Sequence, residues 1–150
     1  MKMNKKKYTI AQILPALNTG GVERGVVEIS KSLIENDFKS IVISSGGYLV
    51  SQITRNGGIH YDLDVHTKNP LKWPKIRNQL KNILESENVD LIHFCSRAPA
   101  WIGVPLGAIL DIPIITSVHM RFRKSNFLKK YYNSILTKGN SIIAISKYMK

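Results

Sequence analysis

The loop Asn18-Thr19-Gly20-Gly21 joins an apolar run to a helical pattern, and its glycine pair is the chain's first candidate for chemistry. Glycine has no Cβ, so Gly20 and Gly21 can take a positive φ and let a ligand approach the backbone. The helix that follows offers unpaired N–H groups and the positive end of its dipole, which favour an anion. The sequence G-G-V-E-R-G lacks the G-x-G-x-x-G spacing of a dinucleotide-binding loop. The residues alone therefore leave two interpretations of the glycine loop open. It is either a plain turn or a loop that a phosphate or sugar approaches.

Polar side chains also end two other apolar runs. Ser96 and Arg97 follow VDLIHFC, and His119 follows IPIITSV. The guanidinium of Arg97 suits a phosphate or an acidic sugar, and its alternative is an ordinary surface position. His119 is either a structural residue at a strand end or a polar contact for a ligand, whereas His93, inside its run, is expected to be buried. Glu23 falls in the first turn of the first helix, where a carboxylate favours the dipole whether or not it contacts a sugar hydroxyl.

Composition limits the classes of protein to consider. The 150 residues are enough for one domain, and an apolar content of 43% is typical of globular proteins. The single cysteine, Cys95, forms no intrachain disulfide, and no Cys/His cluster has the spacing of metal ligands. The net charge of +12 favours an anionic partner, which could be nucleic acid, a phosphorylated small molecule or an anionic membrane. A lysine-rich proteome would produce the same excess of basic over acidic residues.

Strand patterns alternate with helix patterns along the whole chain. Short β-branched runs predict strands at 8–14, 39–45, 59–65, 89–96, 112–119 and 140–146, and helices are predicted from 22, at 48–55, around 76–84, at 98–110 and at 125–137. The apolar character of all strands but the third indicates a parallel sheet that is covered on both faces. The sequence therefore predicts a doubly wound α/β domain with a mostly parallel sheet. In such sheets ligands bind at the carboxyl ends of the strands.

Two segments imitate membrane signals. Residues 1–17 combine a basic start with a short apolar run, but Gln12 and Pro15 interrupt that run, so a first strand is preferred to a signal peptide. Residues 98–118 are long enough to span a bilayer. Because Asp111 and prolines interrupt them, we interpret them as a buried helix followed by a buried strand.

The segment MRFRKSNFLKKYYNS, residues 120–134, carries five cations and four aromatic residues. Basic heads beside aromatic faces suit a membrane interface, and they also suit single-stranded nucleic acid. A solvated basic helix that packs through its aromatic residues is the third alternative. The candidates for membrane contact are Arg121, Phe122, Arg123, Lys124, Phe127, Lys129 and Lys130.

Four motifs in the same order carry a resemblance to a known family. LPALNTGGVERGVVEISKSL resembles the first strand, glycine loop and first helix of family-4 glycosyltransferases, which have the two-domain GT-B architecture. VDLIHFCSRAPAW resembles the fourth-strand motif of that family, IITSVH the next strand, and GNSIIAISKYM the segment that leads into the interdomain region. The likeness covers nearly all of the chain, and four motifs in order are far more specific than any one of them.

The resemblance implies transfer of a sugar, with retention, from a nucleotide-diphosphate-sugar to a bacterial surface-glycan, glycolipid or lipopolysaccharide-type acceptor. It implies a cytoplasmic protein, peripheral on the inner membrane, with no cofactor or metal besides the donor co-substrate. It also makes His119 a catalytic candidate beside the transferred sugar. The donor or acceptor contacts that it implies are Gly20, Gly21, Glu23, Ser96 and Arg97.

By the same resemblance, residues 1–150 are the amino-terminal, acceptor-side domain, and the carboxyl-terminal donor-binding domain is absent or is a separate chain. We therefore expect a truncated protein that is inactive alone. The sequence MRFR after His119 departs from the glycine and aromatic residue often found there, which puts the acceptor in doubt. Two rivals are a non-catalytic remnant or accessory subunit of the same ancestry, and a basic nucleic-acid-binding module. No recognition motif of the nucleic-acid classes supports the second rival.

Overall fold

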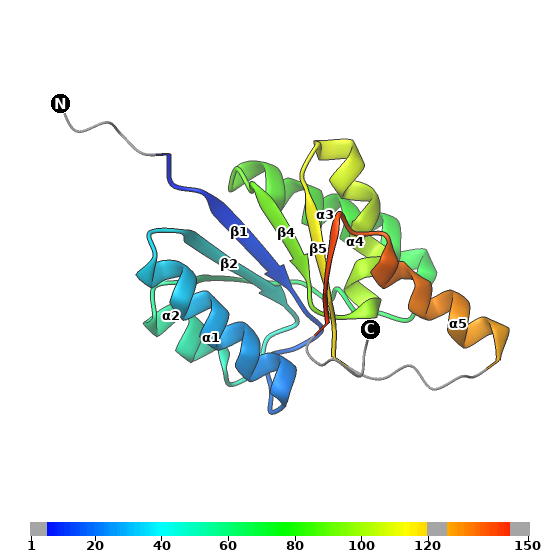
Figure 1. Cartoon of the computed structure of the whole chain (residues 1–150), viewed down its shortest axis with the longest axis horizontal. Helices are drawn as coiled ribbons and strands as arrows, with labels where there is room; N and C mark the ends of the chain where they lie inside the picture. The colour runs from blue at the N-terminus through cyan, green and yellow to red at the C-terminus, as the bar shows by residue number, and fades with distance from the viewer. Residues whose placement is uncertain (1–5, 120–125, 145–150) are drawn as a thin grey trace.

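A computed structural model describes residues 6–119 and 126–144 of the chain and shows a doubly wound α/β domain (Figure 1). The described residues form one six-stranded, all-parallel sheet in the order β3-β2-β1-β4-β5-β6. The predicted fold class is therefore confirmed. The strands are β1 (Thr9–Ile13), β2 (Lys39–Ser44), β3 (Ile59–Asp62), β4 (Leu91–Phe94), β5 (Ile114–Val118) and β6 (Ser141–Ala144).

Helices cover the sheet from both sides. The larger apolar cluster joins strands β1, β2, β4 and β5 to α3, α4 and η2, and the smaller cluster joins the opposite face of the sheet to α1 and α2. In Figure 1, α1 and α2 accordingly lie apart from α3 and α4. The helices are α1 (Gly21–Glu35), α2 (Val50–Arg55), the 3-10 turn η1 (Pro70–Lys72), α3 (Trp73–Ser86), α4 (Arg97–Leu110), α5 (Phe127–Asn133) and the 3-10 turn η2 (Ser134–Thr137).

The strand order fixes where a ligand can bind. The chain runs outward from β1 to β2 and β3, returns to the other side of β1 for β4, and continues to β5 and β6. The loops that leave β1 and β4 therefore diverge to opposite faces of the sheet and leave a crevice between them at the carboxyl ends. All the candidate site residues follow strands whose carboxyl ends meet at this crevice. They lie in the glycine loop, at Ser96–Arg97 and at His119.

Two predictions about packing are wrong in part. The apolar spacing of Val22, Val26, Ile29 and Leu33 predicts the buried face of the first helix. Ile29 is 43% exposed, however, and Ser30 is buried instead, where its Oγ lies 2.7 Å from Ser40 Oγ on β2. Strand β6 was expected to be covered on both faces, yet all four of its residues are exposed. The reason is its place in the fold, because β6 is an edge strand paired only with β5.

The apolar segment 98–118 forms the buried helix and strand that the sequence predicted. Helix α4 ends at Asp111, whose left-handed φ of 54° breaks the helix before Pro113, and β5 follows at once. Gly103 and Gly107 let α4 lie close to the sheet, since a Cβ at Gly103 would stand 2.5 Å from Phe94 Cζ. In the described part of the chain, no helix has both the length and the apolar character needed to cross a bilayer.

Candidate functional site

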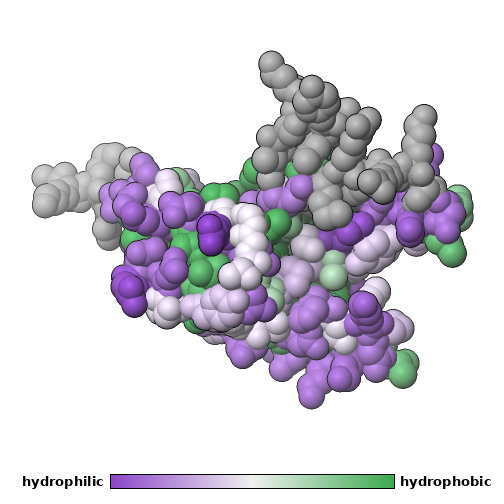
Figure 2. All heavy atoms as spheres, turned by 90° about the horizontal axis from the view of Figure 1, so that it is seen from below, coloured by the Kyte–Doolittle hydropathy of each residue, from purple (hydrophilic) through white to green (hydrophobic). Residues whose placement is uncertain are grey.

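A hollow of about 180 Å³ opens at the carboxyl ends of β1, β4 and β5, where the crevice between diverging loops was expected. Figure 2 looks onto this edge of the sheet, where apolar side chains stand among polar ones. The polar side chains that line the hollow come from three separate segments of the chain. They are Glu23, Ser96, Arg97, Ser117 and His119.

His119 directly follows β5, and its imidazole reaches the hollow. Its Nε2 atom is buried and has no hydrogen-bond partner among the described residues. Burial lowers the pKa of His119 below its usual value of 6.5, and the nearby Glu23 carboxylate opposes that shift. The ring is therefore neutral near pH 7, with one nitrogen able to donate and the other able to accept a hydrogen bond.

The glycine pair differs from the prediction in its backbone. Neither Gly20 nor Gly21 has a φ in the left-handed region, because Gly20 is extended (φ 173°, ψ 168°) and Gly21 is already the first residue of α1. The bare backbone of Gly20 instead leaves room for the Glu23 carboxylate, which a Cβ at Gly20 would meet. Glu23 thereby folds back toward the loop and lines the hollow, while no described atom lies within 4 Å of a Cβ placed at Gly21.

The structure predicts that Gly21→Ala keeps the fold. The helical backbone and open surroundings of Gly21 accept a methyl group, and alanine reduces the entropy of the unfolded chain. The free energy of unfolding should rise by up to about 1 kcal/mol, as measured by urea denaturation. Gly20→Ala is the matched comparison, because its Cβ displaces Glu23. A loss of stability in Gly21→Ala would contradict the open surroundings of that residue.

Ser96 and Arg97 lie at the amino-terminal end of α4, and their side chains differ in whether they have hydrogen-bond partners. Ser96 is the N-cap residue, but its hydroxyl makes no capping hydrogen bond, so the group remains open to the hollow. Arg97 Nη1 donates to Asn133 Oδ1 at 2.5 Å, and its guanidinium lies over the Tyr132 ring, 5.3 Å from the centroid. Arg97 thus links the wall of the hollow to α5.

A buried polar row, which we define as Gln12, His93 and Ser117, reaches the hollow through Ser117. His93 is buried, as predicted, and its Nε2 lies 2.5 Å from Ser117 Oγ. Burial, together with repulsion from His119, lowers the pKa of His93 to about 4. Gln12 pairs with His93 in register across β1 and β4, and neither polar atom of its side chain has a partner in the described residues.

Sequence reasoning missed Ser117 and Asn133. The alternation of a strand places Ser117 on the same face as His119, two residues away, so this signal could have found it. Asn133 lies 36 residues beyond Arg97, and nothing local in the sequence connects the two. Cys95 is buried as expected, and burial raises the pKa of its thiol to about 12, so it is not a nucleophile.

The candidates for membrane contact divide into two groups. Arg121, Phe122, Arg123 and Lys124 lie outside the described residues. Phe127, Lys129 and Lys130 lie on α5 and are exposed. Helix α5 is shorter than the helix predicted at 125–137, because the chain tightens into the 3-10 turn η2 at Ser134.

The hollow therefore gathers a carboxylate, a neutral imidazole and an open hydroxyl around one small space. Such groups accept hydrogen bonds from hydroxyl groups and donate hydrogen bonds to them, as a polyol or sugar ligand requires. Across residues 6–119 and 126–144, no group of three His, Cys, Asp or Glu side chains is placed to hold a metal ion.

Comparison with known proteins gives the family. An uncharacterized glycosyltransferase of Methanocaldococcus jannaschii is 30% identical over 121 residues, which cover 77% of this chain and 30% of that protein. The crystal structure of a glycosyltransferase from Rickettsia africae has a TM-score of 0.79 and 38% identity, and the match covers 93% of this chain and 37% of that one. The chain thus spans well under half the length of both.

A more distant structure shares the fold alone. The lipopolysaccharide outer core galactosyltransferase WaaB has a TM-score of 0.70 at 13% identity, with 94% of this chain and 40% of that chain covered. The family Glycosyltransferase Family 4 matches residues 19–150, which include every polar residue that lines the hollow. The chain belongs to Glycosyltransferase Family 4 and has the Rossmann-like fold of GT-B glycosyltransferases.

Proposed function

We propose that this chain is the acceptor-side domain of a retaining glycosyltransferase. Its reaction transfers a sugar from a nucleotide-diphosphate-sugar to a bacterial surface-glycan or lipopolysaccharide-type acceptor. The observation that carries the proposal is the hollow at the carboxyl ends of β1 and β4, where the chain reverses the direction in which it adds strands. In this chain, which belongs to the family, Glu23, Ser96 and His119 line that hollow. The acceptor class is proposed by analogy with WaaB, a lipopolysaccharide outer core galactosyltransferase that shares the fold. The proposal includes no resident cofactor or metal.

The residues of the hollow have distinct roles in this proposal. Glu23 accepts hydrogen bonds from hydroxyl groups, and the Ser96 hydroxyl both donates and accepts them. Gly20 and Gly21 leave the start of α1 bare, so its unpaired N–H groups can face the donor phosphate. His119, neutral and with a buried unpartnered Nε2, contacts the sugar that moves. Arg97 is held by Asn133 and Tyr132, and so presents a fixed positive charge at the rim.

We further propose that most donor contacts belong to a second domain. The chain covers only 37% of the Rickettsia africae protein and 30% of the Methanocaldococcus jannaschii protein. The purified 150-residue chain should therefore transfer no sugar from any nucleotide sugar, because the groups that grip the diphosphate are elsewhere. A form that carries the donor-binding domain should turn over.

The test is release of the free nucleotide, measured with the short chain, the longer form and their mixture with a set of nucleotide sugars. Turnover by the short chain would contradict the two-domain proposal. A longer form that binds nucleotide sugar but transfers it to no lipid-linked glycan would favour the accessory-subunit alternative. Tight, salt-sensitive binding of a single-stranded oligonucleotide, with no sugar transfer, would favour the nucleic-acid alternative.

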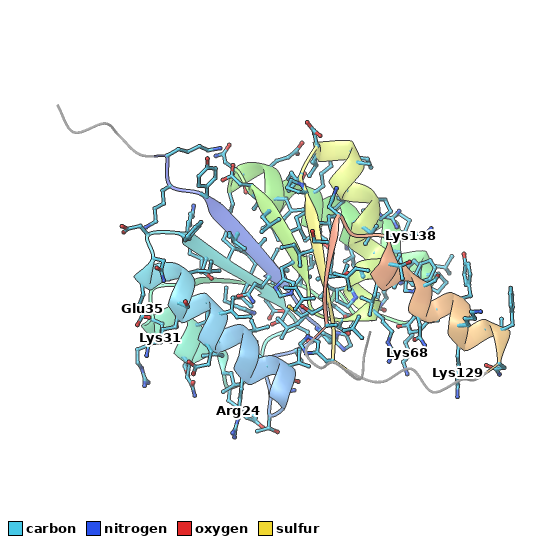
Figure 3. All side chains as sticks on the ribbon, in the orientation of Figure 1. Arg24, Lys31, Glu35, Lys68, Lys129 and Lys138 are labelled. Atoms are coloured by element: carbon cyan, nitrogen blue, oxygen red, sulfur yellow. The ribbon has the colours of Figure 1, made fainter. Side chains whose placement is uncertain are left out.

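We also propose that the protein works at the cytoplasmic face of the inner membrane through α5. Three apolar side chains of this helix project into solvent, with Phe127 80%, Leu128 73% and Tyr131 60% exposed. Lys129 and Lys130 lie between them in sequence, and the chain has no acidic residue after Asp111. In Figure 3, Lys129 and Lys68 both lie on the side of the molecule toward which the strands point, the side that also holds the hollow.

Charge reversal on α5 should weaken binding to vesicles of phosphatidylglycerol and phosphatidylethanolamine. Each cation near an anionic surface contributes on the order of 1 kcal/mol, so Lys129→Glu with Lys130→Glu should lower the partition coefficient at least about 10-fold. The matched control is Lys31→Glu with Lys81→Glu, two lysines on α1 and α3 in exposed ion pairs with Glu35 and Glu85. Equal loss in both double variants would show that only net charge matters.

A further inference from the structure

The loop between β1 and α1 is fastened to the loop between β2 and α2 well past the ends of their strands. Ser45 donates from both its backbone N–H and its Oγ to the Pro15 carbonyl, at 3.0 and 2.8 Å. Leu17 N–H donates to the Gly46 carbonyl at 2.8 Å, and Leu49 N–H donates to the Leu17 carbonyl at 3.0 Å. The path of the first loop is therefore set by the second.

The second loop can make these contacts because of its own glycine pair. Gly46 and Gly47 have φ values of 88° and 136°, a part of backbone space that side chains with a Cβ rarely adopt. At Gly47 a Cβ would also collide with the Leu17 carbonyl group, 2.5 Å from its carbon, and stand 2.7 Å from Asn18 Oδ1. At Gly46 the nearest neighbour of a Cβ is Asp62 Oδ2 at 3.8 Å.

Leu17 cannot easily move away from such a Cβ. Its N–H and its carbonyl oxygen are both hydrogen-bonded to the second loop, and its side chain is fully buried in the smaller apolar cluster. The clash involves backbone atoms rather than the tip of a flexible side chain. A methyl group at Gly47 must therefore push the whole first loop away from β2.

The first loop builds one side of the hollow. Pro15 and Ala16 line it directly, and the loop continues through Gly20 into the first turn of α1, which brings Glu23 to the same space. His119 lies on the other side of that space, close enough for the Glu23 carboxylate to influence its pKa. The distance between these two walls depends on where the first loop is fastened.

We propose that Gly47 is a positioning residue for the candidate site, which sets the β1–α1 loop and its Glu23 against His119. The role of the hollow as a sugar-binding site rests on the proposed function. The positioning of the loop by Gly47 does not, because it can be measured in this chain alone. Gly47 does not line the hollow, and it acts through Leu17 and Asn18. The glycine pair that shapes the site is thus the one after β2, although the loop after β1 is the one that lines the hollow, through Pro15 and Ala16.

The experiment compares Gly47→Ala with two other glycine variants in the isolated chain. Gly46→Ala introduces a Cβ at a positive φ in the same turn without the collision, and Gly57→Ala does so at the end of α2, where the Cβ meets only Ile34 Cγ2 at 3.4 Å. In Gly47→Ala, hydrogen exchange at the Leu17 and Leu49 amides should become roughly 10-fold faster or more, relative to amides in the centre of β2. In the two controls, exchange at these amides should follow the global stability.

A second readout reports on the site itself. If the first loop moves, Glu23 withdraws from His119, and the His119 imidazole should titrate at lower pH in an NMR titration of Gly47→Ala. An unchanged His119 titration together with unchanged Leu17 exchange would overturn the proposal, whatever the enzymatic activity of a longer form.

Ser45→Ala keeps the proposal testable if Gly47→Ala does not fold. This variant removes only the hydrogen bond from Ser45 Oγ to the Pro15 carbonyl and introduces no backbone strain. Exchange at the Leu17 amide should become a few-fold faster, with the same direction of change in the His119 titration. Wild-type exchange at Leu17 in Ser45→Ala would show that the second loop does not hold the first, and would overturn the proposal.

Discussion

Replacing His119 by alanine is expected to lower the kcat of sugar transfer roughly 10- to 1,000-fold and to change KM much less. The variant is made in a form of the protein that carries the donor-binding domain, and initial rates are measured over a range of donor and acceptor concentrations. A contact that strengthens as charge develops on the transferred sugar acts on the transition state, so its loss appears in kcat.

The physical reason lies in the state of the imidazole. Its Nε2 atom is buried at the hollow without a partner among the described residues, and a buried polar atom without a hydrogen bond is costly. A sugar hydroxyl or ring oxygen in the hollow would supply that missing partner. Because burial keeps His119 neutral near pH 7, the contact is a hydrogen bond between neutral groups until charge develops in the reaction.

Two control variants separate this role from a structural one. His119→Asn keeps a hydrogen-bonding side chain of smaller size and should recover part of kcat. His66→Ala removes an exposed histidine outside the hollow and should leave both constants unchanged. If His119→Ala folds normally by circular dichroism and keeps the wild-type kcat, His119 is a strand-end residue without a role in transfer.

The elements of the fold could be predicted because their signals are local. Alternating short β-branched runs and helical stripes found all six strands, and Asp111 with Pro113 marked the end of α4 correctly. Burial was less predictable, because it depends on elements far along the chain. Nothing within β6 indicates that it is an edge strand whose residues are exposed.

The candidate site shows the same division. Ser96 and His119 could be placed at the hollow because parallel strands end at one edge of a sheet, so position along the strand sufficed. The fixing of Arg97 by Asn133 could not be predicted, since it joins two helices across a long separation. The glycines were the clearest failure. The sequence predicts only that Gly46 and Gly47 precede the helix at 48–55, yet these two residues have the positive φ values expected of Gly20 and Gly21.

The second large effect concerns stability in acid. His93 has a pKa near 4 in the folded protein, mainly because of burial and then because of repulsion from His119, whereas the unfolded chain has the usual value of 6.5. Between these values the unfolded state binds a proton that the folded state does not. The stabilisation is therefore complete above about pH 6.5 and is lost as the pH falls toward 4.

The loss from this one group should reach about 3 kcal/mol by pH 4, a large share of the 5–15 kcal/mol that is typical of a domain. His60 and His119, whose pKa values burial also lowers, add to the loss in the same range. Glu87 and Asp90 have pKa values lowered chiefly by hydrogen bonds from Lys39 and Lys6, so their contribution is lost only in stronger acid.

Comparison with His93→Gln isolates the contribution of this histidine. Glutamine can still hydrogen-bond to Ser117 but does not titrate, so the variant should be less stable than the wild type near neutral pH and lose much less stability on acidification. The free energy of unfolding is measured by urea denaturation from about pH 7 down to about pH 4. His66→Gln, which removes an exposed histidine outside the buried polar row, is the matched control for the loss of an imidazole. If the free energies of unfolding of the wild type and of His93→Gln fall in parallel with pH, the prediction is wrong. His93 would then take up its proton without loss of stability, and the polar row of Gln12, His93 and Ser117 would be accessible to water.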